Sequence, residues 1–252
     1  MNNADILVSV IMPAYNAAHY IEASIRSVMD QTVKNWELLV IDDCSRDNTA
    51  EVIARLAEED ARIRLIKNEQ NLGTAGTRNK ALDMFRGKYV AFLDSDDLWH
   101  TEKLERQLRV IEAENADLCY TSYCVVHLDN KMVKKDYIVP RSVSLEDMLK
   151  QNYIGCSTVM LTSELAKKYR FTREFYHEDY VFWLSMLRNG IKTAGIEDVL
   201  MDYSYYSSSR AGNKPAAAKR RWNIYRRYMK FPLLKSFWYM AHYTLAGIRK
   251  YS

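Results

Sequence analysis

The sequence predicts an α/β fold: an open, mostly parallel, twisted sheet with helices on both faces, followed by a C-terminal helical extension. Apolar, β-branched runs alternate with segments of helical spacing through the first hundred residues. Such alternation is typical of a parallel sheet that is covered on both faces. The residues after Asp202, in contrast, include no acidic side chain, which marks them as a segment of a different kind.

The expected elements follow in order along the chain. Strands are expected at residues 7–12, 36–41, 62–66 and 89–93, and helices at 18–30, 47–59, 74–85 and 104–114. Two strand-like runs at 117–127 and 132–139 then flank Asp129-Asn130, which favours a hairpin. The remaining elements are a helix at 144–151, a strand at 157–161, a helix at 180–188, a strand at 192–199, a flexible link at 207–215 and a helical stretch at 216–251.

Composition limits the class of protein. The 252 residues, 48% hydrophobic and 27% charged, can bury one sizeable core, alone or with a small appendage. No secretory signal pattern is visible at the start, and the four cysteines form no CxxC pair. We therefore expect a cytoplasmic protein whose thiols stay reduced and act as small buried hydrophobic groups.

Four polar clusters follow predicted strands or open a helix: residues 13–16, 42–45, 71–79 and 94–97. An open α/β sheet places its binding crevice at the carboxyl ends of its strands. A single acidic cluster there could be a helix cap, but several that converge on one edge indicate a ligand.

The cluster at 94–97 contains three carboxylates, which repel one another unless a cation neutralises them. Hard oxygen ligands favour Mg²⁺ or Mn²⁺, which usually take their remaining ligands from water and substrate phosphates. The alternative is a solvated turn in which Asp97 caps the next helix. In the cluster at 71–79, Gly73 allows close backbone approach and Arg78 can pair with a phosphate. A plain helix start explains that cluster equally well, since it contains neither a dinucleotide fingerprint nor a Walker loop.

The order of these segments resembles that of the family 2 inverting glycosyltransferases of the GT-A fold, in their non-processive bacterial-type members. The resemblance covers residues 6–200 and is carried by PAYN at 13–16, IDDCSRDNT at 41–49, NLGTAGTRN at 71–79, DSDD at 94–97 and HEDYVFW at 177–183. It implies a nucleotide-sugar-binding half at 1–115 and an acceptor-binding half of the same catalytic domain at 116–205. Composition adds a basic, aromatic helical tail at 206–252.

The resemblance also implies roles for individual residues. Asp43 would hold the nucleotide base, and Pro13 and Ala14 would border it. Asp96 would bind the Mn²⁺ or Mg²⁺ ion, while Asp94 would contact the ribose or complete the metal site. The full set of expected donor-site residues is Pro13, Ala14, Tyr15, Asp43, Gly73, Arg78, Asp94, Ser95 and Asp96.

The acid in His177-Glu178-Asp179 matches the family's catalytic base, and we favour Asp179 because it directly precedes the aromatic run at 180–183. Single displacement at an anomeric carbon needs one carboxylate to take the acceptor's proton. The alternative is that these acids only cap the helix, where they favour its positive end. The expected acceptor-side residues are Trp99, His177, Glu178 and Trp183.

The predicted enzyme is a hexosyltransferase-class glycosyltransferase. It would move one sugar from a nucleotide diphosphate, a UDP-hexose or UDP-N-acetylhexosamine, to a saccharide acceptor on a lipid, in cell-surface polysaccharide synthesis. Thymine is the alternative base. Processive synthases of the family carry Q-x-x-R-W, whereas here Ala218 precedes Arg221-Trp222. A nucleotidyltransferase and a non-catalytic sugar-nucleotide-binding scaffold are the rival functions; the first would need a Gly-rich basic loop after the first strand, where this chain has PAYN.

The tail is basic and aromatic. Of the 36 Lys and Arg residues, 11 follow Asp202, whereas all 32 acidic residues lie before Tyr203. We favour peripheral association of this tail with the anionic inner face of the cell membrane. Packing on the catalytic domain or on a second subunit, which would make a homodimer, is the alternative. The acidic body disfavours nucleic acid as a partner.

Overall fold

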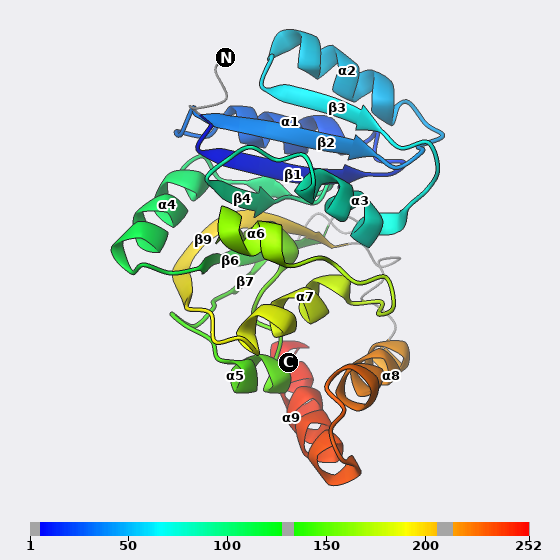
Figure 1. Ribbon diagram of the computed structural model, residues 1–252, viewed down its shortest axis with the longest axis vertical. Coiled ribbons are helices and arrows are strands. Elements are labelled where there is room, and N and C mark those ends of the chain that lie inside the picture. Colours follow the sequence, from blue (N-terminus) through cyan, green and yellow to red (C-terminus); the bar gives the residue numbers. More distant parts are fainter. Residues whose placement is uncertain (1–5, 128–133, 206–213, 252) are drawn as a thin grey trace.

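The computed structural model describes residues 6–127, 134–205 and 214–251. Nine strands form one sheet in the order β3-β2-β1-β4-β8-β6-β9-β5, with β7 paired to β6 (Figure 1). The strands are β1 Val8–Ala14, β2 Trp36–Asp42, β3 Ile63–Lys67, β4 Tyr89–Phe92, β5 Leu98–Trp99, β6 Leu118–His127, β7 Lys134–Tyr137, β8 Met160–Thr162 and β9 Thr193–Tyr205.

The expected parallel sheet forms the first half. Neighbours among β3, β2, β1 and β4 are all parallel, with Val8 opposite Trp36 and Tyr89. Beyond β4 the pairing changes: β8 is antiparallel to β4 and β6, whereas β9 runs parallel to β6. Antiparallel β7, which pairs with β6, completes this mixed half. The turn expected at 129–130 lies outside the described residues.

Side chains alternate sides along each buried strand, so both faces of the sheet are apolar. Helices cover both faces. One core contains Val10, Val40 and Ala91 and is covered by α1 Ile21–Met29, α2 Thr49–Glu59 and α4 Lys103–Ala113. The other contains Ile11, Leu39 and Phe92. Its helices are α3 Gly73–Leu82, α5 Leu145–Lys150, α6 Ser163–Lys168 and α7 Glu178–Leu187. The α/β class predicted from the sequence is therefore confirmed.

The C-terminal segment is helical, as expected, but it is not one helix. It comprises α8 Lys214–Asn223, a π-helical turn at Ile224–Tyr228, and α9 Leu233–Tyr251, which projects below the sheet in Figure 1. Ile224 and Tyr225 are buried in the core, and the Tyr225 hydroxyl donates to the Leu149 carbonyl at 2.6 Å. Part of the tail thus packs on the catalytic domain. No helix in the described part of the chain is both long and apolar enough to cross a bilayer.

Two smaller expectations were wrong in detail. The strand expected at 157–161 begins with a 3₁₀ turn at Cys156–Thr158, and only Met160–Thr162 pairs as β8. The late strand expected at 192–199 continues to Tyr205, because β6 offers a long parallel partner as far as His127. Of the four thiols, none of which forms a disulfide, three are buried as expected and Cys44 is partly exposed.

Candidate active site

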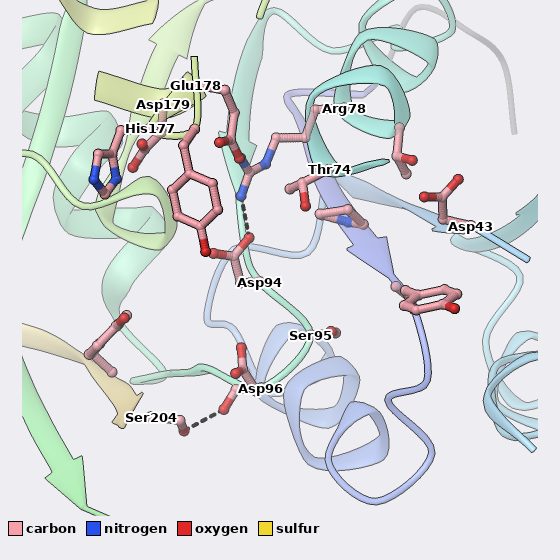
Figure 2. Close-up of a pocket in the computed structure, with 16 residues that line it drawn as sticks. Asp43, Thr74, Arg78, Asp94, Ser95, Asp96, His177, Glu178, Asp179 and Ser204 are labelled. Atoms are coloured by element: carbon pink, nitrogen blue, oxygen red, sulfur yellow. Dashed lines mark hydrogen bonds and ion pairs between the residues drawn. The ribbon is translucent and has the colours of Figure 1, made fainter. Parts of the chain in front are cut away.

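A cavity of ≈ 480 Å³ opens at the carboxyl ends of β1, β2 and β4 (Figure 2). Most of the residues that the sequence singled out line it: Pro13, Ala14, Tyr15, Asp43, Arg78, Asp94, Ser95, Asp96, His177, Glu178 and Asp179. The ends of the parallel strands bring the segments from Pro13 to Asp96 together, and the start of α7 adds residues 177–179, up to 166 positions away in the sequence. The cavity also has walls from Thr74, Thr77, Tyr176, Tyr203 and Ser204, which sequence analysis missed.

Asp43 organises the loop that leads into α3. Its Oδ1 accepts hydrogen bonds from the Leu72 backbone N–H and from Asn68 Nδ2, both at 2.7 Å. Its Oδ2 accepts one from the Gly73 backbone N–H at 2.8 Å. Asp43 therefore fixes the shape of this end of the cavity, which it also lines.

Gly73, expected to contact the donor, donates its N–H to Asp43 and is not among the residues that line the cavity. Its backbone lies at φ +68°, a conformation that L side chains rarely adopt. A Cβ added there would meet nothing within 4 Å. Glycine is thus required by the backbone conformation of the turn, and not because a side chain would clash there.

The acidic turn at 94–97 separates into two functions. Asp94 and Asp96 line the cavity, whereas Asp97 is only 1% exposed. Asp97 accepts from Ser157 Oγ at 2.5 Å and from the Ser204 backbone N–H at 2.9 Å, so it joins the turn to the second half of the sheet. Burial, with the neighbouring acids, raises its pKa well above the ordinary value. The alternative reading of Asp97 as a helix cap is wrong, since α4 begins later, after Glu102.

Asp94 and Asp96 fit a divalent cation. Burial and the charge of Asp94 raise the pKa of Asp96 to about 6, and no described side chain forms an ion pair with its carboxylate. Two carboxylate ligands on one wall suit Mg²⁺ or Mn²⁺, which would complete its shell with water and donor phosphates. Within the described residues no group of three or more His, Cys, Asp or Glu side chains makes a self-sufficient metal site.

Arg78 lies between the two acidic walls (Figure 2). Its Nη2 is 2.5 Å from Asp94 Oδ1 and its Nη1 is 3.1 Å from Glu178 Oε1, while the side chain is 3% exposed. Burial disfavours the charged guanidinium, but the surrounding negative groups outweigh it and raise the pKa of Arg78. The sequence suggested that Arg78 pairs with a donor phosphate. The structure shows a cation already held by two carboxylates, which ties the acidic turn to α7.

The acids at the start of α7 differ in what they contact. Glu178 is paired with Arg78, and burial raises its pKa despite that cation. Asp179 accepts the Tyr180 backbone N–H with Oδ1 at 2.7 Å. Its other oxygen has no recorded partner among the described residues, and the side chain borders the cavity. Of the two, Asp179 is the carboxylate that forms no ion pair among the described residues, so it can accept a hydrogen bond from a bound hydroxyl.

His177 sits beside these acids as the residue before α7. Burial lowers the pKa of His177, and the cations Arg221 and Arg220 lower it further against the opposing effect of Asp179. A neutral imidazole on the wall can donate one hydrogen bond to a substrate and accept another.

Two expected acceptor-side residues lie in the core instead. Trp99 is 4% exposed, and its Nε1 donates to the Ser157 carbonyl at 2.8 Å. Trp183 is fully buried among aromatic rings, 6.1 Å from Phe92 and 6.4 Å from Phe171 between centroids. Neither lines the cavity, so neither can touch an acceptor there.

Comparison with known families agrees with this geometry. The model of glycosyl transferase family 2 matches residues 9–163, more than half of the chain. This chain belongs to that family. It is 37% identical, over 99% of both chains, to a putative teichuronic acid biosynthesis glycosyltransferase, TuaG, of Bacillus subtilis. It is 40% identical to WfgD of Escherichia coli, a UDP-Glc:alpha-D-GlcNAc-diphosphoundecaprenol beta-1,3-glucosyltransferase, over 98% of this chain and 96% of that one.

Solved structures confirm the fold. TarS 1–349 of S. aureus, in complex with UDP-GlcNAc, superposes with a TM-score of 0.73 at 21% identity, covering 95% of this chain and 72% of that one. The mannosyltransferase PcManGT of Pyrobaculum calidifontis, in complex with GDP-Man and Mn²⁺, has a TM-score of 0.69 at 17% identity, covering 95% and 73%. The chain is thus a family 2 glycosyltransferase with the GT-A fold.

Proposed function

We propose that this glycosyltransferase moves one hexose or N-acetylhexosamine from UDP to a sugar that is carried on a lipid diphosphate, with inversion at the anomeric carbon. One observation carries the proposal: a carboxylate with a spare oxygen, Asp179, lines the same cavity as the metal-suited pair Asp94 and Asp96. The named activities of WfgD and of WfaP, both on a diphosphoundecaprenol-linked sugar, support the acceptor class.

The residues divide the work by position. Asp179 takes the proton from the acceptor hydroxyl as that oxygen attacks the donor's anomeric carbon. Asp94 and Asp96 would hold Mn²⁺ or Mg²⁺, which supplies positive charge for the departing diphosphate. Arg78 keeps Asp94 and Glu178 in place from within the wall. Because only one carboxylate contacts the reacting atoms, the displacement is single and the configuration inverts; a retaining route would need a second as nucleophile.

The nucleotide end is formed by Pro13, Ala14 and Asp43. Asp43 already accepts three hydrogen bonds, which orient its carboxylate. We infer that its remaining edge accepts the imide N–H of a uracil ring, with thymine as the alternative base. Tyr15, 48% exposed at the rim, is placed to cover the base.

We also propose that the enzyme works at the inner, anionic face of the cell membrane, through a different part of the tail than the sequence suggested. Arg220 and Arg221 pack on the catalytic domain, which removes them from a membrane-facing surface. The apolar face of α9 is instead exposed. It consists of Leu234 (86% exposed), Phe237 (61%), Trp238 (46%) and Leu245 (56%).

Charge favours a lipid leaflet as the occupant of this apolar face. Lys230 and Lys235 flank it and are exposed, and the segment after Asp202 contains no acid. Aromatic and aliphatic side chains beside basic ones are the usual composition of helices that lie in a membrane interface. A second copy of the chain would bury the same face as a homodimer, and sedimentation without lipid would reveal it.

A donor screen tests the proposed activity. Thermal stabilisation by nucleotide sugars, with and without Mn²⁺, identifies the donor. Transfer to a GlcNAc-diphosphate lipid is then followed by proton NMR of the product. We expect stabilisation by a UDP-sugar that depends on the metal, and a β-linked product from an α-linked donor. Neither hydrolysis nor transfer with any donor would indicate a sugar-nucleotide-binding scaffold, and a retained anomer would contradict single displacement.

A further inference from the structure

Two arginines of α8 lie against the residues that carry the base. The Arg220 Cζ is 3.3 Å from the centroid of the Tyr176 ring, and the Arg221 Cζ is 3.6 Å from that of Tyr180. Tyr176 lines the active-site cavity, and Tyr180 follows Asp179 directly. The C-terminal segment therefore places positive charge next to the acceptor side of the cavity.

These guanidinium groups lack the anionic partners that such groups normally have. Arg220 Nη1 is buried without a hydrogen-bond partner, as are Arg221 Nε and Nη1. None of the ion pairs among the described residues includes either arginine, whereas Arg78 has two carboxylates. A guanidinium stays charged, and leaving its buried donors unpaired is costly. Such an arrangement favours an incoming anion.

The two arginines are not equivalent. Arg221 is 5% exposed and lies between Tyr180 and Tyr243, so it serves to fix α8 on α7. Arg220 is only partly buried and stacks on the 41%-exposed Tyr176 at the cavity wall. Only Arg220 is placed to meet a ligand. The influence of both on the pKa of His177 shows that their charge reaches this wall.

We propose that Arg220 binds the diphosphate of the lipid-linked acceptor, an inference that rests on the proposed function. The acceptor hydroxyl must lie at Asp179, and the diphosphate is attached to the other side of the same sugar ring. Tyr176 and Asp179 line the same cavity, and Arg220 stacks on Tyr176. A planar, forked guanidinium suits two phosphate oxygens at once.

The path of the lipid supports this position. Trp222, two residues after Arg220, packs on Phe237 with ring centroids 4.8 Å apart. Phe237 belongs to the apolar face of α9. A diphosphate at Arg220 would thus lie between the sugar in the cavity and the surface proposed to contact the membrane. The donor carries a diphosphate as well, but Asp94 and Asp96 account for that group at the opposite wall.

Comparing acceptors with and without a diphosphate tests whether Arg220 binds the diphosphate of the acceptor or that of the donor. The assay measures KM for two acceptors with three proteins: the parent, Arg220→Gln and Arg227→Gln. Arg227 is the matched control because it is an exposed arginine of the π-helical turn. One acceptor is a short-chain alkyl GlcNAc diphosphate and the other a neutral alkyl GlcNAc glycoside. We expect Arg220→Gln to raise KM for the diphosphate acceptor by about 10- to 100-fold, as for loss of a charge-assisted hydrogen bond or two. KM for the neutral glycoside should stay near the parent's, and Arg220→Lys should recover part of the loss.

Each of the other possible results of this assay would contradict the proposed role of Arg220 in a different way. Equal losses with both acceptors would make Arg220 a packing residue, and an unchanged KM for the diphosphate acceptor would remove it from the acceptor site. A raised donor KM would assign Arg220 to the donor diphosphate. If the parent itself transfers to neither acceptor, the proposed function fails, and that result is distinguishable from all of these.

Discussion

Lys103 offers a quantitative test of how this fold tolerates a buried cation behind the active site. Its Nζ is fully buried, donates to Gln107 Oε1 at 2.6 Å, and lies 4.1 Å from the centroid of the Trp99 ring. No carboxylate among the described residues is paired with it. Burial lowers the pKa of Lys103 to about 7, from an ordinary 10.5.

The sign of the effect follows from proton uptake. Between the two pKa values the unfolded chain holds the proton and the folded chain has largely lost it, so the free energy of unfolding rises with pH. From pH 7 to pH 9 this one group adds about 2 kcal/mol to stability. The rise levels off as pH passes the unfolded pKa, where burying Lys103 no longer costs a proton, and below pH 7 the full cost of the buried cation is present.

Urea unfolding of the parent and of Lys103→Met at pH 7, 8 and 9, followed by tryptophan fluorescence, measures this difference. The variant should lack the rise of about 2 kcal/mol, because the other titrating groups are shared and cancel. Loss of the hydrogen bond to Gln107 shifts the variant by a constant and leaves the slope alone. Lys167→Met, at an exposed position of α6, is the control. Parallel pH profiles for parent and Lys103→Met would refute the reasoning.

Three further predictions concern function. Asp179→Asn should lower turnover by ~10²–10⁴-fold with little change in donor affinity. Glu178→Gln, which breaks the pair with Arg78, should mainly lower the melting temperature. If stopped assays show that Glu178→Gln lowers turnover and Asp179→Asn does not, Glu178 is the base. Asp96→Ala or a chelator should abolish transfer, and full activity of that variant in metal-free buffer would exclude the metal role. Phe237→Ser with Trp238→Ser should weaken pelleting with anionic vesicles and spare donor hydrolysis; undiminished pelleting would mean that the apolar face of α9 does not contact lipid.

The donor side of the cavity could be predicted from the sequence because it depends on local patterns. Pro13, Asp43 and Asp94 each come just after an apolar run, and a parallel sheet places the ends of such runs at one edge. The same reasoning located Asp179 at the start of a helix. No knowledge of distant contacts was needed beyond the direction of the strands.

The errors arose where a role depends on distant partners. Trp99 and Trp183 stand beside functional segments, but only the packing of β5 and α7 shows that their rings point inward. The pairing of Arg78 with Glu178 joins residues 100 positions apart. The sequence does not distinguish whether Arg220 and Arg221 contact phospholipid or tyrosine rings. In the structure both guanidinium groups lie over tyrosine rings.

The contacts of Asp97 have a consequence for the order in which the chain folds as it is synthesised. The four parallel strands β1–β4 are complete at Phe92, but both hydrogen-bond partners of the Asp97 carboxylate come much later, at Ser157 and Ser204. Until β8 and β9 have joined the sheet, the acidic turn has no support from that side. A nascent chain that ends before Ser204 would therefore have its four parallel strands but not the support of the acidic turn, so the wall formed by Asp94 and Asp96 should be complete only when the last strand is added.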